Sequence, residues 1–513
     1  MARLPLPRPE LSSRDAASAA VAAAVPASVR ELVATLHAHG HAAYVVGGSV
    51  RDVLLGRAAA DWDLATDATP ERIVAVVPES AYENRFGTVG VRRRDGVHEI
   101  TTFRTDHEYA DFRRPHHVEF GESLEADLAR RDFTINAIAW GLARPEAGRP
   151  VDARAVGPGS VAAVPATLPA GAVPTTGRPA TEAAPRDRGS LLAEATLVDP
   201  FDGLSDLAAG VLRAVGDAGT RFEEDALRMI RAIRLAATLD FAIEPATLDA
   251  LRSRAALAQH LSSERIAAEL EKLLAVPAPS GGLALLMDTG LLGVVSPELA
   301  AQRGIAQNKI PGEDLWDHTL RTVDAAPADR PVVRLAALLH DIGKPATLSD
   351  GRFHGHEAVG AHLAEDLLRR LRVPRATAER VVHLVRNHMF VYKGGWGDAA
   401  IRRFIRKIGR DALEELFLLR EADDVGSGLS RGDAGLDELR VRVAEQLAAD
   451  VVLDRADLAI DGHDLIRELG LKPGPALGRV LDVLLERVIL DPALNDRPTL
   501  LLLAQASMTE DRT

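Results

Sequence analysis

The stretch VVGGSVRDVLLGRAAADWDLAT (45–66) holds side chains suited to binding phosphate groups. Gly47-Gly48 follows an apolar strand and precedes a predicted helix, so backbone N–H groups there can approach an anion closely. Arg51 adds a guanidinium fork that suits phosphate oxygens. A glycine pair before a helix is often only a turn, so this motif alone assigns no function.

Asp61 and Asp63 follow this turn along the chain. Residues two apart in a strand point to the same face, which would bring the two carboxylates side by side. That arrangement is unfavourable unless cations neutralise it, and hard oxygen ligands suit Mg²⁺ and triphosphate chemistry. A lone pair of this kind is commonly a solvated acidic turn, but the preceding glycine turn favours a metal site. Glu99, on the predicted strand HEITTFR, is a candidate third carboxylate, although a surface position fits it equally well.

A helix is predicted over EEDALRMIRAIR (223–234), with Glu224, Arg228 and Arg231 along one stripe. Such charges commonly form a salt-bridged face, but arginines at every third position, ending at Arg234, would be unusual there. Cytosine and adenine each present an amino donor beside a ring-nitrogen acceptor. Asp225 could accept from the first and Arg228 could donate to the second. Uracil and guanine would leave both side chains unpaired, at about 1–3 kcal/mol each, so this helix could select C and A without a template.

A second candidate site follows the order His318, then His340-Asp341, then Asp423. This order resembles the HD phosphohydrolase superfamily, and the resemblance implies a helical fold in which these groups bind a divalent metal. Imidazole and carboxylate ligands suit transition metals or Mg²⁺. His356 and His388 fall where metal or phosphate contacts occur in the extended pattern. Hydrolysis at this site and a role mainly as a scaffold for RNA both remain open.

Length and composition limit what else the chain can be. Its 513 residues suffice for several domains, and 61 basic against 74 acidic residues give a net charge of −13. A chain this acidic does not bind polyanions over its whole surface, so any nucleic acid must bind to local basic patches. Aromatic residues make up only 4%, which argues against a surface built mainly from base-stacking platforms. The absence of cysteine excludes disulfides and thiolate zinc sites, and it fits a reducing cytoplasm.

Three basic clusters are candidate RNA contacts, although charge runs are commonly solvated faces. They are Arg92–Arg94, Arg113-Arg114 and IRRFIRKIGR (401–410). In the third, the apolar residues lie on one side of a predicted helix. We therefore expect its other side to present Arg402, Arg403 and Arg406 to an RNA backbone.

The elements that must position these residues divide the chain. We expect a flexible tail over 1–27, a helix containing residues 29–36, a buried strand at 42–46, and a hairpin around Asp95-Gly96. Residues 144–195 have no hydrophobic period and are rich in Ala, Pro and Gly, which predicts a disordered insertion in a loop between two strands. After Gly216 nearly everything is predicted to be helical. No apolar run reaches the length of a membrane span.

Five motifs together resemble the class II tRNA nucleotidyltransferase and bacterial poly(A) polymerase family. They are GGSVRD, DWD, RRDFTINAIAW (130–140), DPFDGLSDL (199–207) and FEEDALRMIRAIRLAA (222–237). The resemblance implies an α+β fold: a polymerase-β-like head with a small mixed sheet and helices, followed by all-α neck, body and tail. It implies nucleotide contacts from Gly47, Gly48, Arg51, Arg131, Asp225, Arg228, Arg231 and Arg234. The expected domains are the tail 1–27, head 28–215, neck 216–300, HD domain 301–430 and C-terminal helical tail 431–513.

The resemblance implies a cytoplasmic enzyme that adds or repairs the CCA 3′ end of tRNA from CTP and ATP. Asp61 and Asp63 would hold Mg²⁺ for this reaction, with Glu99 beside them. Because Mg²⁺ can lower the pKa of a hydroxyl, no side-chain general base is assigned. The alternatives are a poly(A) polymerase or A-adding enzyme of the same family, an HD-type phosphohydrolase, and a non-catalytic RNA-binding protein. A second divalent metal is expected in the HD site, and no obligate protein partner is inferred.

Overall fold

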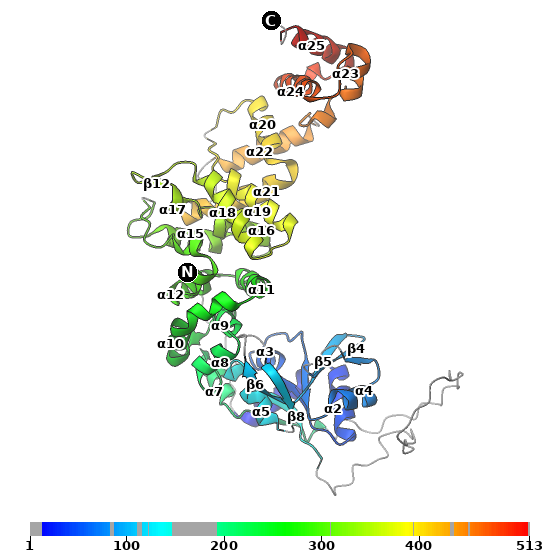
Figure 1. Ribbon diagram of the computed structural model, residues 1–513, viewed down its shortest axis with the longest axis vertical. Helices are drawn as coiled ribbons and strands as arrows, with labels where there is room; N and C mark the ends of the chain where they lie inside the picture. Colours follow the sequence, from blue (N-terminus) through cyan, green and yellow to red (C-terminus); the bar gives the residue numbers. More distant parts are fainter. Residues whose placement is uncertain are drawn as a thin grey trace, which may run out of the picture. The chain divides into compact units, whose positions relative to one another are not determined.

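A computed structural model provides the structure of the chain (Figure 1). It describes residues 13–82, 87–109, 115–121, 123–145, 192–307, 309–392, 394–430, 435–449 and 452–510. The predicted cluster Arg113-Arg114 and most of the predicted insertion lie outside these residues. The chain forms two compact units, Met1–Leu261 and Ser262–Thr513. Their boundary falls inside the region predicted as the neck.

The first unit is built on a mixed seven-stranded sheet in the order β3-β4-β5-β2-β1-β8-β9. Antiparallel pairs join β1 to β2 and to β8, whereas β2 and β5 run parallel. The strands are β1 (Ala43–Val46), β2 (Asp63–Thr66), β3 (Ser80–Tyr82), β4 (Thr88–Arg93), β5 (Gly96–Thr102), β8 (Ala139–Leu142) and β9 (Thr196–Val198). A separate antiparallel pair consists of β6 (Arg104–Tyr109) and β7 (Pro115–Phe120). The predicted hairpin is confirmed as β4–β5, with Arg93 paired to Gly96.

The neighbouring strands β8 and β9 are antiparallel, with Trp140 opposite Leu197. The long segment between them therefore connects two adjacent strands, which confirms the predicted place of the insertion. Residues 146–191 of that segment lie outside the described part of the chain.

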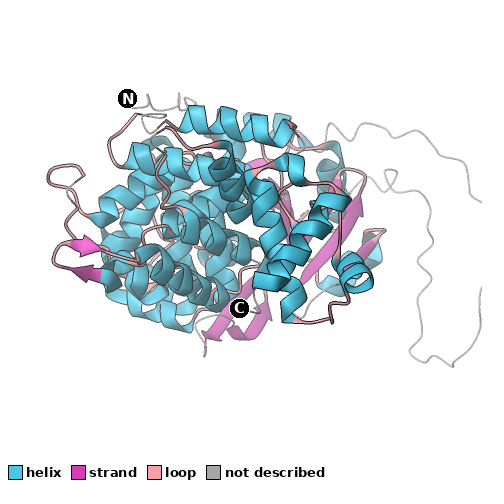
Figure 2. Ribbon diagram, turned by 90° about the horizontal axis from the view of Figure 1, so that it is seen from above, coloured by secondary structure: helices cyan, strands magenta, loops and turns pink. Residues whose placement is uncertain are grey.

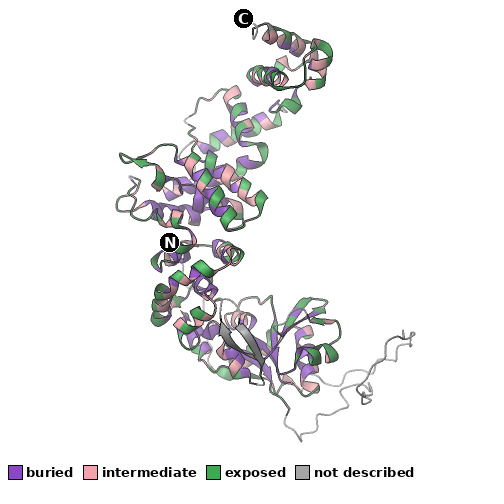
Figure 3. Cartoon of the chain, in the orientation of Figure 1, coloured by how far each residue is buried: buried purple, intermediate pink, exposed green. Residues whose placement is uncertain are grey.

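Helices pack around the sheet, and their apolar faces are buried (Figure 3). They are α1 (Arg14–Ala24), α2 (Ala27–Ala38), α3 (Gly48–Leu54), α4 (Pro70–Val76) and α5 (Leu124–Ala129). The prediction of a flexible tail through residue 27 is wrong for α1. Ser13 caps this helix, and Ala17 and Val21 are buried in the fold. No single described helix is long and apolar enough to cross a membrane, although α1 and α2 together, bent by 110°, meet the length and composition test.

The rest of the first unit is mainly helical. It comprises α7 (Gly203–Ala209), β10 (Val211–Leu212), α8 (Ala218–Glu224), α9 (Leu227–Leu239), β11 (Ala242–Ile243) and α10 (Pro245–Arg254). The predicted single helix over 223–234 is wrong. Asp225 adopts an extended conformation and ends α8, and α9 starts two residues later.

Helices make up most of the described residues (Figure 2), and the second unit is almost entirely helical. Its first part holds α11 (Ser263–Leu274), α12 (Ser280–Asp288), α13 (Leu291–Val295), α14 (Pro297–Ala300), α15 (Leu315–Ala325), α16 (Pro331–Leu339), α17 (Lys344–Thr347), α18 (His356–Arg370), α19 (Arg375–Asn387) and α21 (Leu413–Gly426). Beyond them lie α20 (Asp398–Ile408), α22 (Leu436–Ala448), α23 (Gly462–Leu469), α24 (Pro475–Leu490) and α25 (Arg497–Glu510). A short hairpin joins β12 (Leu348–Ser349) to β13 (Arg352–Phe353). The last three helices share an apolar core of their own.

Helix α20 corrects one prediction about RNA contact. Arg402 is buried, and its guanidinium donates hydrogen bonds to the carbonyl of Ile489 (2.8 Å) and to Gln446 (2.7 Å). It therefore faces the protein interior, because it satisfies carbonyl groups near the end of α24. Arg403 and Arg406 remain partly exposed, but both pair with Glu486.

Candidate functional site

The sheet of the first unit places the glycine turn next to the acidic residues. Val46 pairs with Asp63, so Gly47 follows directly at the end of β1. Leu64 pairs with Ile100 on the parallel strand β5, which puts Asp63 and Glu99 at neighbouring positions one residue earlier. Because Leu64 and Ile100 are fully buried and both acidic residues are exposed, the two carboxylates share the solvent-facing side of the sheet.

Asp61 lies just before β2 and not within it. The side chain of Trp62 is buried, whereas Asp61 and Asp63 on either side of it are exposed. This alternation supports the prediction that both carboxylates point away from the core. Asp61, Asp63 and Glu99 together are called the acidic group below.

The charges of the acidic group act on one another. The pKa of Asp63 rises from 3.8 to about 6, first because its carboxyl is shielded from water and next because Glu99 is close. Asp61 raises it further, while Arg131 and Arg231 oppose the change. A bound cation would relieve this repulsion, and the donors are hard oxygens, so the group fits Mg²⁺. The oxygens do not, however, form a set of three within 4.8 Å of one another.

The turn at Gly47 requires glycine. Its φ of +80° disfavours a side chain, and a Cβ there would lie 2.9 Å from Nη1 of Arg131. Within the described part of the chain, the buried hydroxyl of Ser49 and the buried Nε of Arg131 have no hydrogen-bond partner. Polar atoms left in this way beside a glycine turn are available to a ligand.

A hydrogen-bonded network links the turn to helix α9. Arg51 donates from Nη1 to Oδ1 of Asn136 (2.7 Å), and the Asn136 amide donates to Asp132 (2.9 Å). Asp132 also pairs with Nε of Arg231 at 2.6 Å. The positive charge of Arg231 and the hydrogen bond from Asn136 overcome burial and lower the pKa of Asp132. Sequence reasoning missed Asn136, although it lies in the motif RRDFTINAIAW.

The residues expected to read the base lie at the break between α8 and α9. Asp225 accepts from the backbone N–H of Leu227 (3.0 Å). Arg228 donates to Glu224 (2.6 Å) and to the carbonyl of Arg130 (2.8 Å). The structure thus places Asp225 and Arg228 together at a junction of two helices, where Arg228 already bonds to the protein. Arg234 lies one turn beyond Arg231 on α9.

Five helices of the second unit bring the predicted HD residues together. Nε2 of His318 on α15 lies 3.1 Å from Nε2 of His340 and 3.2 Å from Oδ1 of Asp423 on α21. Oδ2 of Asp341 is 3.1 Å from His340, while its Oδ1 is 3.4 Å from His356. The residues form two groups of three, and within each group the ligand atoms all lie within 4.8 Å of one another. The first group is His318, His340 and Asp423, and the second is Asp341, His356 and His388. These are called metal group one and metal group two.

The orientation of the imidazoles suits metal binding. Nδ1 of His340, His356 and His388 each lies 2.7–2.8 Å from a backbone carbonyl. Such a bond fixes the proton on Nδ1 and leaves the Nε2 lone pair facing the centre. All six residues of the two groups are buried. The donor set therefore fits two divalent ions, with Asp341 offering one oxygen to each group.

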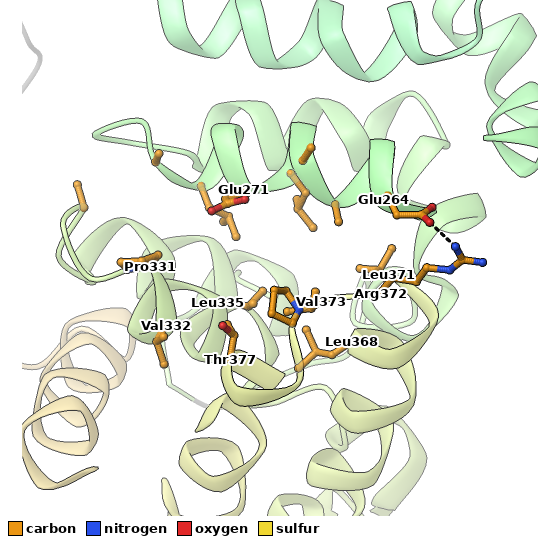
Figure 4. A pocket seen from close by; sticks show the side chains of 17 residues that line it. Glu264, Glu271, Pro331, Val332, Leu335, Leu368, Leu371, Arg372, Val373 and Thr377 are labelled. Atoms are coloured by element: carbon orange, nitrogen blue, oxygen red, sulfur yellow. Dashed lines mark hydrogen bonds and ion pairs between the residues drawn. The ribbon is translucent and has the colours of Figure 1, made fainter. Parts of the chain in front are cut away.

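A cavity of about 560 Å³ lies apart from these residues, between α11 and the helices α16, α18 and α19 (Figure 4). Aliphatic side chains such as Leu335 and Leu368 line most of it. An ion pair between Glu264 and Arg372 lies at its edge. None of the residues of the acidic group or of the two metal groups lines it.

The first unit has the fold of a nucleotidyltransferase head. A family model described as "Poly A polymerase head domain" matches residues 43–153, and one described as "Probable RNA and SrmB- binding site of polymerase A" matches residues 240–303. An HD domain model matches residues 312–427, which contain all six residues of the two metal groups.

The chain belongs to the family of CCA-adding enzymes. The CCA-adding enzyme of Lactococcus lactis subsp. cremoris (strain MG1363) is 32% identical over 468 residues, which are 90% of this chain and 92% of the relative. That of Geobacillus stearothermophilus is 39% identical over 261 residues, 51% of this chain and 52% of the relative. The crystal structure of the Bacillus stearothermophilus CCA-adding enzyme in complex with CTP matches with a TM-score of 0.63 at 27% identity, covering 94% of this chain and 98% of that one.

Proposed function

We propose that the protein adds and repairs the CCA 3′ end of tRNA with CTP and ATP as substrates. The observation that carries the proposal is the acidic group beside the Gly47-Gly48 turn, in a chain of the CCA-adding family. The proposal includes a cytoplasmic location, where tRNA and nucleoside triphosphates are available. It also includes the division into head, neck, HD domain and C-terminal tail predicted from the sequence.

In the proposed reaction the RNA 3′ hydroxyl attacks the α-phosphorus of the nucleotide and pyrophosphate leaves. Asp61 and Asp63 would hold Mg²⁺, with Glu99 beside them, and the metal supplies charge neutralisation and a lowered hydroxyl pKa. Arg51 and Arg131 face the glycine turn and would bind the triphosphate. The unpaired Nε of Arg131 is a donor available for this purpose.

Selection of the base is proposed to rest on Asp225 and Arg228. A cytosine or adenine would accept a hydrogen bond from Arg228 in competition with the carbonyl of Arg130. Asp225 ends α8 and Arg228 lies in the first turn of α9, so both side chains come from the junction of the two helices. Arg231 and Arg234 are proposed to lie toward the nucleotide.

The test uses tRNAs that end at the discriminator base, at the first C or at CC. Each is incubated with labelled CTP and ATP, separately and together. Ordered addition of C, C and A is expected, and Asp61→Ala or Asp63→Ala should abolish it. Unlimited A addition would instead identify the poly(A) polymerase alternative, and addition that survives both substitutions would contradict the proposal.

A second function is proposed for the HD domain: metal-dependent hydrolysis of phosphate esters on nucleotides or RNA ends. The observation that favours it is the pair of buried metal groups bridged by Asp341. The ion is proposed to be Mg²⁺ or a transition metal, since imidazole and carboxylate ligands bind both classes. Phosphate release that survives Asp61→Ala but not Asp341→Ala would support this activity. Release that is unaffected by Asp341→Ala would contradict it.

A further inference from the structure

A lysine lies within metal group one. Nζ of Lys309 is 3.2 Å from Nε2 of His318 and 3.4 Å from Oδ1 of Asp423. These two atoms are ligand atoms of the group. An imidazole nitrogen has a single lone pair, so it cannot accept a hydrogen bond from the ammonium and bind a metal at the same time.

A second lysine contacts Asp341, the residue shared by the two metal groups, and it is held differently. Nζ of Lys344 donates to Oδ2 of Asp341 at 2.5 Å and lies 5.4 Å from the centre of the Phe353 ring. Its side chain is only 8% exposed. The centre therefore contains two carboxylates, Asp341 and Asp423, and two ammonium groups that balance their charge.

The two lysines differ in how easily their ammonium groups could move away from the metal ligands. The side chain of Lys309 is 32% exposed, and its contacts are 0.7 Å and 0.9 Å longer than the 2.5 Å contact of Lys344. It also belongs to the segment before α15 and not to a packed helix. Asp423 would keep a cation without Lys309, because Arg420 lies 3.7 Å from its other oxygen.

We propose that Lys309 is a displaceable counter-ion of metal group one, which a divalent ion must expel before it can bind. A metal ion and an ammonium sharing the same ligand atoms would repel each other strongly in this buried site. Lys309 thus weakens metal binding to this group, and it holds the carboxylate in place when no ion is there. This inference rests on the metal centre proposed above for the HD domain.

The test measures Mn²⁺ binding by isothermal titration calorimetry at one fixed pH. The full chain carries Asp61→Ala and Asp63→Ala, so that the acidic group of the first unit does not contribute. Lys309→Met removes the charge but keeps a side chain of similar length, and Lys309→Arg keeps the charge. Lys472→Met, an exposed lysine far along the chain, is the matched control.

Lys309→Met should bind Mn²⁺ at least tenfold more tightly than the parent, whereas Lys309→Arg and Lys472→Met should bind it like the parent. In EDTA, Lys309→Met should unfold at a lower temperature than the parent, and Mn²⁺ should raise its unfolding temperature by more. Unchanged Mn²⁺ affinity in Lys309→Met, together with loss of binding in Asp341→Ala, would overturn the inference and leave the metal centre standing. Binding that persists in Asp341→Ala would overturn both.

Discussion

Replacing Asp63 by Asn should stabilise the protein at alkaline pH even as it removes a proposed metal ligand. The pKa of Asp63 is raised from 3.8 to about 6, so the folded state disfavours the ionised carboxylate. The folded state binds more protons than the unfolded state between these values, and stability therefore falls as the pH rises through this window. Above about pH 7 the whole penalty is present.

The size of the effect follows from the shift and from exposure. A fully shielded carboxyl with this change would lose about 3 kcal/mol. The Asp63 residue keeps part of its surface in water although its carboxyl is partly shielded, and screening by this water reduces the expected penalty to about 1 kcal/mol. For a unit of this size, about 1 kcal/mol corresponds to roughly 2–4 °C in unfolding temperature.

The assay is thermal unfolding in EDTA, followed by tryptophan fluorescence at pH 4 and pH 8. Asp63→Asn should unfold at a higher temperature than the wild type at pH 8 and at a similar temperature at pH 4. Glu99→Gln should lower the pKa of Asp63 and move the loss of stability to lower pH, because Glu99 is the leading charge that raises it. Asp249→Asn, an exposed carboxylate on α10, is the control and should change nothing.

Equal unfolding temperatures for Asp63→Asn and the wild type at pH 8 would refute the reasoning. The result would mean that neither shielding from water nor the charge of Glu99 raises the pKa of Asp63 enough to affect stability. It would also remove the physical argument that this group needs a cation.

Asn136→Ala should raise the KM for CTP and ATP by roughly five- to a hundredfold, because a donor of Arg51 loses its buried partner at a cost of about 1–3 kcal/mol. Steady-state kinetics measures this, and an unchanged KM would exclude a positioning role for Asn136. Arg402→Ala should destabilise the second unit by about 3 kcal/mol, because the carbonyl of Ile489 and other acceptors lose the hydrogen bonds of a buried guanidinium. Denaturant unfolding measures the change in stability, and a loss below about 1 kcal/mol would contradict this prediction. Arg403→Ala should change stability by less than about 1 kcal/mol, and it should weaken tRNA binding in a salt-dependent way. A filter-binding titration measures the affinity for tRNA, and an unchanged affinity would exclude a contact between Arg403 and the RNA.

The sequence predicted those parts of the molecule that depend on local pattern. The strand before Gly47, the β4–β5 hairpin and the place of the long insertion are all confirmed by the sheet register. The HD residues were identified by their order, although 82 residues separate Asp341 from Asp423, and the structure brings them together. Their roles in catalysis remain predictions.

Two of the failures share a physical cause, which is that a distant segment supplies a partner that no local pattern reveals, whereas the third has a local cause. Composition alone could not show that Ala17 and Val21 are buried against the head. Arg402 belongs to a basic helix face, but carbonyl groups near the end of α24 draw its guanidinium inward. The break at Asp225 interrupts a sequence with strong helical periodicity, because Asp225 accepts the N–H of Leu227 as a helix cap does.

The two sites shift the pKa of their carboxylates in opposite directions, and this difference affects how each site would bind a metal. In the acidic group of the first unit, shielding from water raises the pKa of Asp63, and the charges of Glu99 and Asp61 raise it further against the opposing arginines. In the HD centre, His340 and Lys344 hold the pKa of Asp341 well below its usual value despite burial. A metal that arrives with a nucleotide therefore meets an excess of negative charge in the first unit. A metal entering the HD centre must instead exchange with positive charge already present, so that centre should load more slowly and more selectively.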